Sequence, residues 1–337
     1  LHDALPIYDL SVSQEQTVEI VKVLFRGAEI LILDEPTAVL TPQETDRLFQ
    51  VVRNMRADGK AIVLITHKLH EVLSVSDEVA VLRKGKYIGT VKTSEATAQS
   101  LTDMMVGRAV SLNIDRPDPV DPKPRLKIEG LTCVDNLGVK RLDNVTFTAM
   151  SGEILGIAGI AGSGQRELLE CITGLYPVEH GTVTFLPEGK PAQQLIGKTP
   201  NQIRKAGVAM AFVPEDRLGM GLVGSMGMGS NMMLRSWRKG KGAFVNRRDP
   251  NKLAMEVMEE LEVVTPSIST PVRRLSGGNV QKVLVGREIA MSPSVLLTAY
   301  AVRGLDINTS YTIYNLLTQQ KMKGSAVVFV GEDLDVL

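Results

Sequence analysis

The residues best suited to chemistry lie in the first third of the chain, at the ends of two apolar runs. Asp34 and Glu35 end the run "ILILDEP" (30–36), and His67 ends the run "AIVLITH" (61–67). Phosphoryl chemistry needs a metal ligand, a base that polarises water and a group that holds the γ-phosphate. We expect Asp34, Glu35 and His67 to take these three roles in that order. The alternative is that Asp34 and Glu35 only cap the turn that follows the first run.

A glycine-rich stretch, "LGIAGIAGSGQRELL" (155–169), is a second candidate site. Gly159 and Gly164 have the spacing of a phosphate-binding loop, and Gly162 and Ser163, which lie between them, are further candidate nucleotide-binding residues. Such a loop continues with Lys and then Ser or Thr, but this chain has Gln165 and Arg166 there. Each lost charged contact costs ~1.5–3 kcal/mol, so the two losses weaken binding roughly 10²- to 10⁴-fold. We expect the loop to keep its fold and weak or non-hydrolytic nucleotide binding, since its backbone amides remain. The glycine order does not fit the dinucleotide-binding pattern G-x-G-x-x-G.

A third candidate is "RLSGGNVQK" (274–282), which precedes an apolar helical pattern. A hydroxyl and backbone amides at a helix N-terminus can bind an anion. The residues that would do so are Ser276, Gly277, Gly278 and Asn279. The alternative is an ordinary helix cap with a glycine turn.

The elements that must position these residues alternate between strand and helix patterns. The runs that end near Asp34 and His67 are apolar and rich in β-branched residues, as buried parallel strands are. Between them, residues 41–59 predict a helix, with Thr41 as its cap and Pro42 in its first turn. Strand–helix–strand units form parallel sheets with their sites at the carboxyl ends of the strands. The sequence therefore predicts an α/β fold.

The chain also contains an internal repeat. The segment that begins at Asp9 aligns without gaps with the segment that begins at Arg274, an offset of 265 residues. The same offset places "IVLITHKLHEVL" (62–73) on "VVFVGEDLDVL" (327–337). A gapless match over two separate stretches indicates two copies of one domain.

The boundary between the copies falls in the proline-rich segment "DRPDPVDPKPRLKIEG" (115–130), which is typical of a stiff linker. We expect a non-native or truncated leader at 1–8, the C-terminal part of a first domain at 9–112, a linker at 113–125, and a second domain without its C-terminus at 126–337.

The composition is that of an ordinary soluble globular protein. The chain has 337 residues, enough for about two domains, with Lys plus Arg equal to Asp plus Glu at 38 each. This balance gives no indication of nucleic-acid binding. Two cysteines cannot build a disulfide framework, and no apolar run is long enough to cross a bilayer. Any membrane role must therefore come through a partner.

Taken together, these motifs resemble the ATP-binding cassette ATPases, specifically the two-cassette subunits of bacterial sugar and nucleoside importers. "ILILDE" is similar to the Walker B motif with its catalytic glutamate, "ITH" to the switch histidine, and "LSGGN" to the family signature. "AFVPEDR" (211–217), which contains Glu215, is similar to this subfamily's glutamine loop. "RGLD" (303–306), which ends in Asp306, is similar to the loop after Walker B. The resemblance implies tandem P-loop NTPase-like cassettes, each with a parallel sheet and a helical subdomain, the first being incomplete.

In that family two cassettes face each other head to tail, and each ATP lies between the Walker motifs of one and the signature of the other. The first copy keeps the catalytic residues, where the second has Ala299, Tyr300 and Glu332. The second copy keeps "LSGGN" and Asp306, where the first has "LSVSQ" and Thr41. The resemblance therefore implies one complete and one degenerate composite site.

The implied function is ATP hydrolysis with Mg²⁺ that energises import of a simple sugar or nucleoside. The implied partners are membrane permease subunits and, indirectly, an extracellular substrate-binding protein, with no nucleic acid. The implied place is the cytoplasmic face of the membrane. The methionine-rich stretch 218–237 would lie in the helical subdomain that touches the permease, or pack internally.

Two further interpretations stay open. The chain could belong to a two-cassette protein that acts on ribosomes or DNA, although such relatives are expected to keep both sites intact. It could also be a non-functional gene fragment. The first cassette's P-loop should precede residue 9, so we expect this chain alone not to hydrolyse ATP.

Overall fold

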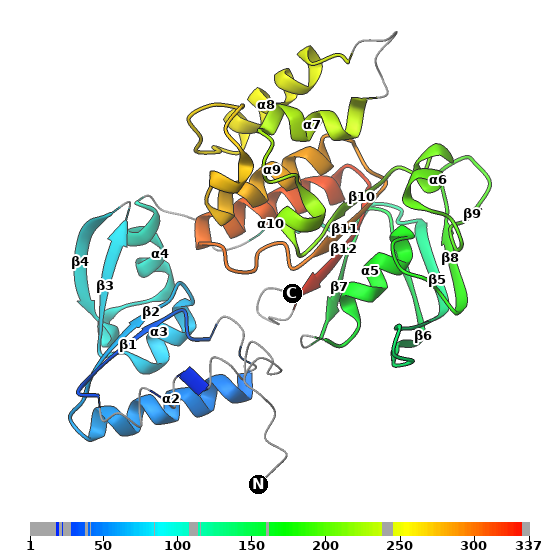
Figure 1. Ribbon diagram of the computed structural model, residues 1–337. Coiled ribbons are helices and arrows are strands. Elements are labelled where there is room, and N and C mark those ends of the chain that lie inside the picture. Colours follow the sequence, from blue (N-terminus) through cyan, green and yellow to red (C-terminus); the bar gives the residue numbers. More distant parts are fainter. Residues whose placement is uncertain are drawn as a thin grey trace. The chain divides into compact units, whose positions relative to one another are not determined.

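The computed structural model in Figure 1 shows an α/β protein that divides into two compact units, Leu1–Leu112 and Asn113–Leu337. The structure describes residues 18–19, 22, 28–37, 40, 42–83, 85–107, 114, 116–159, 162–237 and 245–331. We describe each unit by itself.

The described residues of the first unit include a short parallel sheet, a hairpin and the helices that follow these strands. Its elements are β1 (Ile30–Asp34), α2 (Pro42–Ala57), β2 (Ala61–Ile65), α3 (Leu69–Val75), β3 (Glu78–Arg83), β4 (Lys86–Lys92) and α4 (Ala98–Val106), with a 3₁₀ turn at Thr93–Glu95. Strands β1 and β2 pair in parallel, with Asp34 opposite Ile65. The carboxyl ends of both strands therefore lie side by side.

Helix α2 confirms the helix predicted between the two apolar runs. Pro42 is its first residue, and Gly59 adopts the left-handed backbone, with φ of 79°, just after its end. The predicted cap, Thr41, lies outside the described residues. The apolar side chains of α2 pack against β1 in one buried cluster, which consists of Leu31, Leu33, Leu48, Phe49 and Val52.

The prediction that the run 30–36 forms a buried strand is wrong for one face of β1. Ile30 is 64% exposed and Ile32 is 66% exposed. In the second unit their repeat partners, Val295 and Leu297, are fully buried. The physical reason is that α2 covers one face of β1, whereas the described part of this unit places no core cluster against the other.

The second unit contains two sheets with helices between and around them (Figure 1). The parallel sheet has the order β10-β11-β12-β7, and the antiparallel sheet has the order β6-β5-β8-β9. The strands are β5 (Pro124–Val134), β6 (Lys140–Met150), β7 (Ile154–Ala158), β8 (His180–Phe185), β9 (Gln193–Gln194), β10 (Met210–Val213), β11 (Val295–Ala299) and β12 (Ala326–Gly331). The helices are α5 (Gln165–Thr173), α6 (Pro200–Lys205), α7 (Met228–Ser236), α8 (Arg248–Glu260), α9 (Gly277–Ile289) and α10 (Ile307–Met322), with short π and 3₁₀ turns at Arg217–Gly221 and Val272–Arg274.

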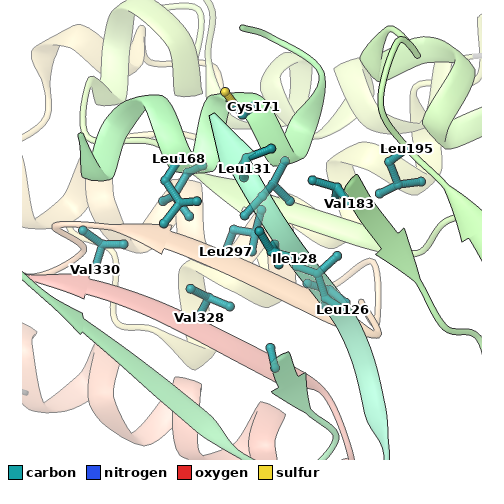
Figure 2. Packing of buried hydrophobic residues seen from close by; sticks show 14 of the residues in the cluster. Leu126, Ile128, Leu131, Leu168, Cys171, Val183, Leu195, Leu297, Val328 and Val330 are labelled. Atoms are coloured by element: carbon teal, nitrogen blue, oxygen red, sulfur yellow. The ribbon is translucent and has the colours of Figure 1, made fainter. Parts of the chain in front are cut away.

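Two buried clusters cover the two faces of this parallel sheet. On one face, α5 and β5 contribute Leu168 and Leu131 to the cluster that contains Leu297 and Val328 of the sheet (Figure 2). The second cluster joins the sheet to the helical part of the unit through α8, α9 and α10. Strands covered on both faces have no polar side to alternate with, which explains why β11 and β12 are buried along their whole length.

The repeat seen in the sequence has a structural counterpart. Strand β11, helix α10 and the start of β12 fall 265 residues after β1, α2 and β2. Glu35 and its repeat partner Tyr300 both have positive φ, 45° and 49°. Their N–H groups donate to equivalent carbonyls, Glu35 to Ile65 at 2.8 Å and Tyr300 to Val330 at 2.9 Å. The same backbone frame therefore carries different side chains in the two units.

Candidate functional site

The candidate site of the first unit lies where β1 and β2 end. Glu35 Oε1 lies 2.8 Å from His67 Nδ1, so the structure brings together the two residues that the sequence placed 32 positions apart. Both side chains are about one-third exposed. The Asp34 side chain is exposed at the last residue of β1. A carboxylate and an imidazole in contact at this edge can act together on a water molecule or a phosphate.

The second carboxylate oxygen of Glu35 is also informative. Oε2 is buried and, in the described structure, accepts no hydrogen bond. Buried polar atoms are nearly always paired, so an unpaired acceptor here fits a site that receives a hydrogen-bond donor such as water. The backbone of Glu35 is in the left-handed region, which costs a non-glycine residue about 1–2 kcal/mol. Its N–H bond to Ile65 holds that conformation.

The sequence did not reveal a buried carboxylate in the helix that follows His67. Glu71, in the first turn of α3, is 1% exposed. It accepts a hydrogen bond from Thr37 Oγ1 at 2.7 Å and lies 3.2 Å from Lys68 Nζ. The signal that could have found it is the repeat, because Thr37 and Glu71 align with Val302 and Val336.

The equivalent strand end in the second unit has no carboxylate at the position of Glu35. Tyr300 is 8% exposed and belongs to the cluster around α5. The guanidinium of Arg303 lies 5.7 Å from the centre of its ring, within the range of a cation–π contact. Ala299 takes the place of Asp34 at the end of β11. Glu332, in the place of His67, lies outside the described residues.

The glycine-rich stretch forms the strand–loop–helix arrangement of a phosphate-binding loop, between β7 and α5. Gly164 caps α5 with φ of 93°, and a Cβ on it would lie 2.4 Å from the Arg141 carbonyl oxygen, so only glycine fits. Gly162 and Ser163 are exposed. Residues 160–161 lie outside the described part of the loop.

The two residues that replace the expected Lys and Ser/Thr are both engaged. Gln165 is 4% exposed, and its Nε2 lies so close to Gly159 that a Cβ there would be 2.2 Å away. Its amide therefore lies against the loop. Arg166 Nε donates to Glu170 Oε1 at 2.7 Å, and this hydrogen bond raises the pKa of Arg166 above its usual value. Neither side chain reproduces the lysine or the hydroxyl that would meet a nucleotide's phosphates and Mg²⁺.

The signature stretch is both a helix cap and part of a polar cluster. Ser276 Oγ caps α9 by accepting from the Asn279 backbone N–H, and it also accepts from Asn279 Nδ2 at 2.9 Å. Gly278 lies beside Thr309, whose Oγ1 donates to Asp306 Oδ2 at 2.7 Å. Gly277, the first residue of α9, lies near Arg217. The structure thus places the signature next to the loop that contains Asp306.

Glu215 lies in the loop after β10, and Asp306 lies in the loop after β11. Two arginines, Arg217 and Arg303, connect these loops. Arg303 Nη1 donates to Glu215 Oε1 at 2.8 Å, and Arg217 Nη2 donates to the Arg303 carbonyl at 2.5 Å. Burial lowers the pKa of Arg217. The loop after β10 and the loop after β11 are therefore held together.

The predicted site residues thus form separate groups in the two units. Asp34, Glu35 and His67 gather in the first unit. In the second unit, the glycine-rich stretch runs from β7 into α5, and the signature residues lie with Asp306.

The methionine-rich stretch is buried in one part and exposed in another. Met228 and Met232 of α7 are fully buried in the second cluster, so they pack internally. Met220 and Met226 are exposed by 42% and 39%. The helices in the described ranges include none that is both long and apolar enough to span a membrane.

Asp34 fits a magnesium site better than a site built from many protein ligands. The described residues contain no group of three or more His, Cys, Asp or Glu side chains placed to hold a metal. Mg²⁺ is usually bound through one or two carboxylates, with substrate phosphates and waters completing the shell. A single exposed carboxylate at a strand end is the donor such an ion needs from the protein.

Comparisons with known proteins all find ATP-binding proteins of transport systems. Residues 142–298 match the family model described as "ABC transporter". The nucleoside import ATP-binding protein NupA of Lactococcus lactis is 39% identical over 336 residues, covering 99% of this chain and 65% of NupA. The glucose import ATP-binding protein TsgD13 of Haloferax volcanii is 38% identical, covering 98% of this chain and 60% of TsgD13. The chain therefore spans less than two thirds of the length of these relatives.

A solved structure agrees with the fold. The dimeric structure of a post-hydrolysis state of the ATP-binding cassette MJ0796, bound to ADP and Pi, matches with a TM-score of 0.54 and 24% identity. The match covers 63% of this chain and 89% of that one. It bears out the α/β cassette fold predicted from the sequence.

Proposed function

This chain carries an ABC transporter ATP-binding domain, and from that premise we propose that the protein containing it hydrolyses ATP to energise an importer. The observation that carries the proposal is the contact of Glu35 with His67 at 2.8 Å, beside the exposed Asp34. In this arrangement Glu35 accepts a proton from the attacking water, and His67 orients Glu35 and contacts the γ-phosphate. The unpaired Oε2 of Glu35 is the acceptor available to that water.

Mg²⁺ belongs to the proposal as the ion that Asp34 holds. When bound, it would neutralise charge on the β- and γ-phosphates of ATP. Asp34 sits at the end of β1, one residue before the base, so the ion and the water would be presented from the same strand end.

We propose that residues 9–112 and 126–337 belong to two cassettes joined by the linker 113–125. In the complete protein, one ATP site would combine Asp34, Glu35 and His67 with the signature residues Ser276–Asn279 and Asp306. The other site would have the glycine loop with Gln165 and Arg166 and a tyrosine at the base position, so it would bind ATP without hydrolysing it. The identity of residue 300 supports this division. It is a buried tyrosine, so the position of Glu35 in this copy carries no carboxylate that could act as a base.

The transported molecule would be a simple sugar or a nucleoside. The supporting observation is the 38–39% identity to NupA and TsgD13, whose names state nucleoside import and glucose import. The partners would be permease subunits, and indirectly an extracellular binding protein, with the ATPase at the cytoplasmic face of the membrane. The exposed Met220 and Met226 offer adaptable apolar surface for such a partner.

The experiment compares two substitutions at repeat-related positions in the protein expressed from its complete gene together with candidate permease subunits. We expect Glu35→Gln to lower the rate of Mg-dependent ATP hydrolysis roughly 10²- to 10⁴-fold, the usual contribution of a general base. Tyr300→Phe should change the rate less than about 2-fold, because it alters the position that carries no base.

Equal losses in both variants would contradict the assignment of one complete site. Absence of hydrolysis in the unsubstituted protein would contradict the function itself. Co-purification of the ATPase with ribosomes instead of membranes would favour a protein that acts on ribosomes.

A further inference from the structure

Among the described residues of the first unit, Glu71 is the most buried acidic side chain that the proposed chemistry does not use. Its carboxylate accepts hydrogen bonds from Thr37 Oγ1 at 2.7 Å and from Thr66 Oγ1 at 3.4 Å, and it forms an ion pair with Lys68 Nζ at 3.2 Å. His70 Nε2 lies 4.0 Å away. The carboxylate is 1% exposed, so taking it out of water has a cost that these contacts must offset.

These contacts connect the two loops that carry the catalytic pair. Thr37 follows Glu35 by two residues, and Thr66 and Lys68 flank His67. Lys68 adds a second link, since its Nζ donates to the Thr37 carbonyl at 3.1 Å and its N–H donates to Thr66 Oγ1 at 3.1 Å. Glu71 therefore holds the loop after β1, which contains Glu35, against the loop after β2, which contains His67.

The second copy of the domain indicates that the fold itself does not need this network. Where the first unit has Thr37 and Glu71, the second has Val302 and Val336. Val302 packs against the second unit's buried cluster, so an apolar side chain fits at that point of the fold. The polar pair is absent from the copy that has also lost the catalytic glutamate and histidine, and present in the copy that keeps them.

We infer that Glu71 is a positioning residue, which fixes the distance between Glu35 and His67 by tying Thr37 to Lys68. The inference rests on the proposed function. Glu71 itself touches neither of the two reacting side chains. It acts through the loops, and its loss allows them to separate by a fraction of an ångström to an ångström, which at a catalytic pair can cost ~100-fold in rate.

The chain supplies the variant that separates positioning from stability. The double substitution Thr37→Val with Glu71→Val recreates the pair found in the second unit. Replacing both Thr37 and Glu71 by apolar groups removes both ends of their contact, which is often nearly neutral for stability, whereas removing one leaves the other unsatisfied. Lys68 and Thr66 remain, but Lys68 Nζ keeps its hydrogen bond to the Thr37 carbonyl and Thr66 Oγ1 keeps the one from the Lys68 N–H. We expect the double variant to unfold at a temperature close to that of the unsubstituted protein, and Glu71→Val alone to unfold earlier.

The rate should behave differently from the stability. In the protein expressed from its complete gene, we expect the double variant to lose about 10- to 100-fold in kcat for ATP hydrolysis, with KM changed less than about 3-fold. Glu71→Gln keeps an acceptor for Thr37, and Thr37→Ser keeps the hydroxyl. Both conservative variants should therefore retain kcat within about 3-fold.

Hydrogen exchange tests the same inference without ATP turnover. In the double variant, amides in segments 35–37 and 66–71 should exchange at least about 10-fold faster, while those of α2 remain unchanged. An unchanged kcat in a stably folded double variant, or unchanged exchange in both loops, would overturn the inference. If the unsubstituted protein hydrolyses no ATP, the proposed function fails, and hydrogen exchange alone decides whether Glu71 holds the loops together.

Discussion

Replacing Glu288 by glutamine should destabilise the second unit severely. Glu288, in α9, is fully buried and surrounded by donors: Arg235, Arg287 and the Phe212 N–H all donate to its two oxygens. Arg287 is itself 6% exposed, and burial lowers its pKa while Glu288 acts in the opposite direction. A glutamine replaces one acceptor with an NH₂ group that faces these donors, and it removes the buried negative charge.

The expected magnitude follows from that burial. Removing one member of a buried, hydrogen-bonded ion pair costs about 3–5 kcal/mol in the free energy of unfolding. The matched control is Glu129→Gln, because Glu129 also pairs with a cation, Lys127 at 2.8 Å, but the two side chains are 49% and 47% exposed. An exposed pair contributes ~0–1 kcal/mol, so the control should remain close to the unsubstituted protein.

The assay is equilibrium unfolding in urea, followed by the fluorescence of Trp237. It is the chain's one tryptophan and lies at the end of α7, the helix that supplies Arg235. A loss below about 1 kcal/mol for Glu288→Gln, or an equal loss for both variants, would refute the reasoning that burial makes this pair indispensable.

Two further predictions concern the glycine loop and the core. Restoring the usual loop residues with Gln165→Lys and Arg166→Ser should tighten binding of a fluorescent ATP analogue to this chain by roughly 10²- to 10⁴-fold; unchanged affinity would show that the loop's backbone, not these side chains, prevents binding. Ile128→Ala, at a fully buried core position, should cost about 2–5 kcal/mol in urea unfolding, and a cost below about 1 kcal/mol would contradict the packing described for this cluster.

The sequence predicted the strands and the helix around the end of β1 well because their signals are local and repeated. Two apolar runs that end in polar residues, with a capped helix between them, define β1, α2 and β2, and the parallel pairing then brings Glu35 to His67. Because the repeat has a constant offset of 265 residues, the same signals also predict β11, α10 and β12. The motif also identified Gly164 as the residue before α5. Its backbone there is left-handed, a conformation that favours the glycine that the motif requires.

The features that escaped the sequence depend on contacts between distant residues. Glu71 lies on an ordinary helical pattern, and only the folded chain reveals that its carboxylate turns inward to Thr37. The exposure of Ile32 was missed, since an apolar run does not specify which elements cover each of its faces. The inward placement of Gln165 likewise depends on its fit beside Gly159, which spacing alone does not determine.

The central claim is the proposal that the signature of the second copy, rather than the equivalent stretch of the first, takes part in ATP hydrolysis. Its most direct test substitutes the same residue type at repeat-related positions, Ser276→Ala and Ser11→Ala, in the protein expressed from its complete gene, and measures ATP hydrolysis at saturating ATP. Ser276→Ala also removes the cap of α9, which costs ~1 kcal/mol, so both variants are first checked for folding by thermal unfolding. We predict that Ser276→Ala lowers the rate at least about 10-fold, the effect of losing a hydrogen bond to a phosphate, and that Ser11→Ala leaves it unchanged. A loss with Ser11→Ala equal to or larger than that with Ser276→Ala would contradict the claim.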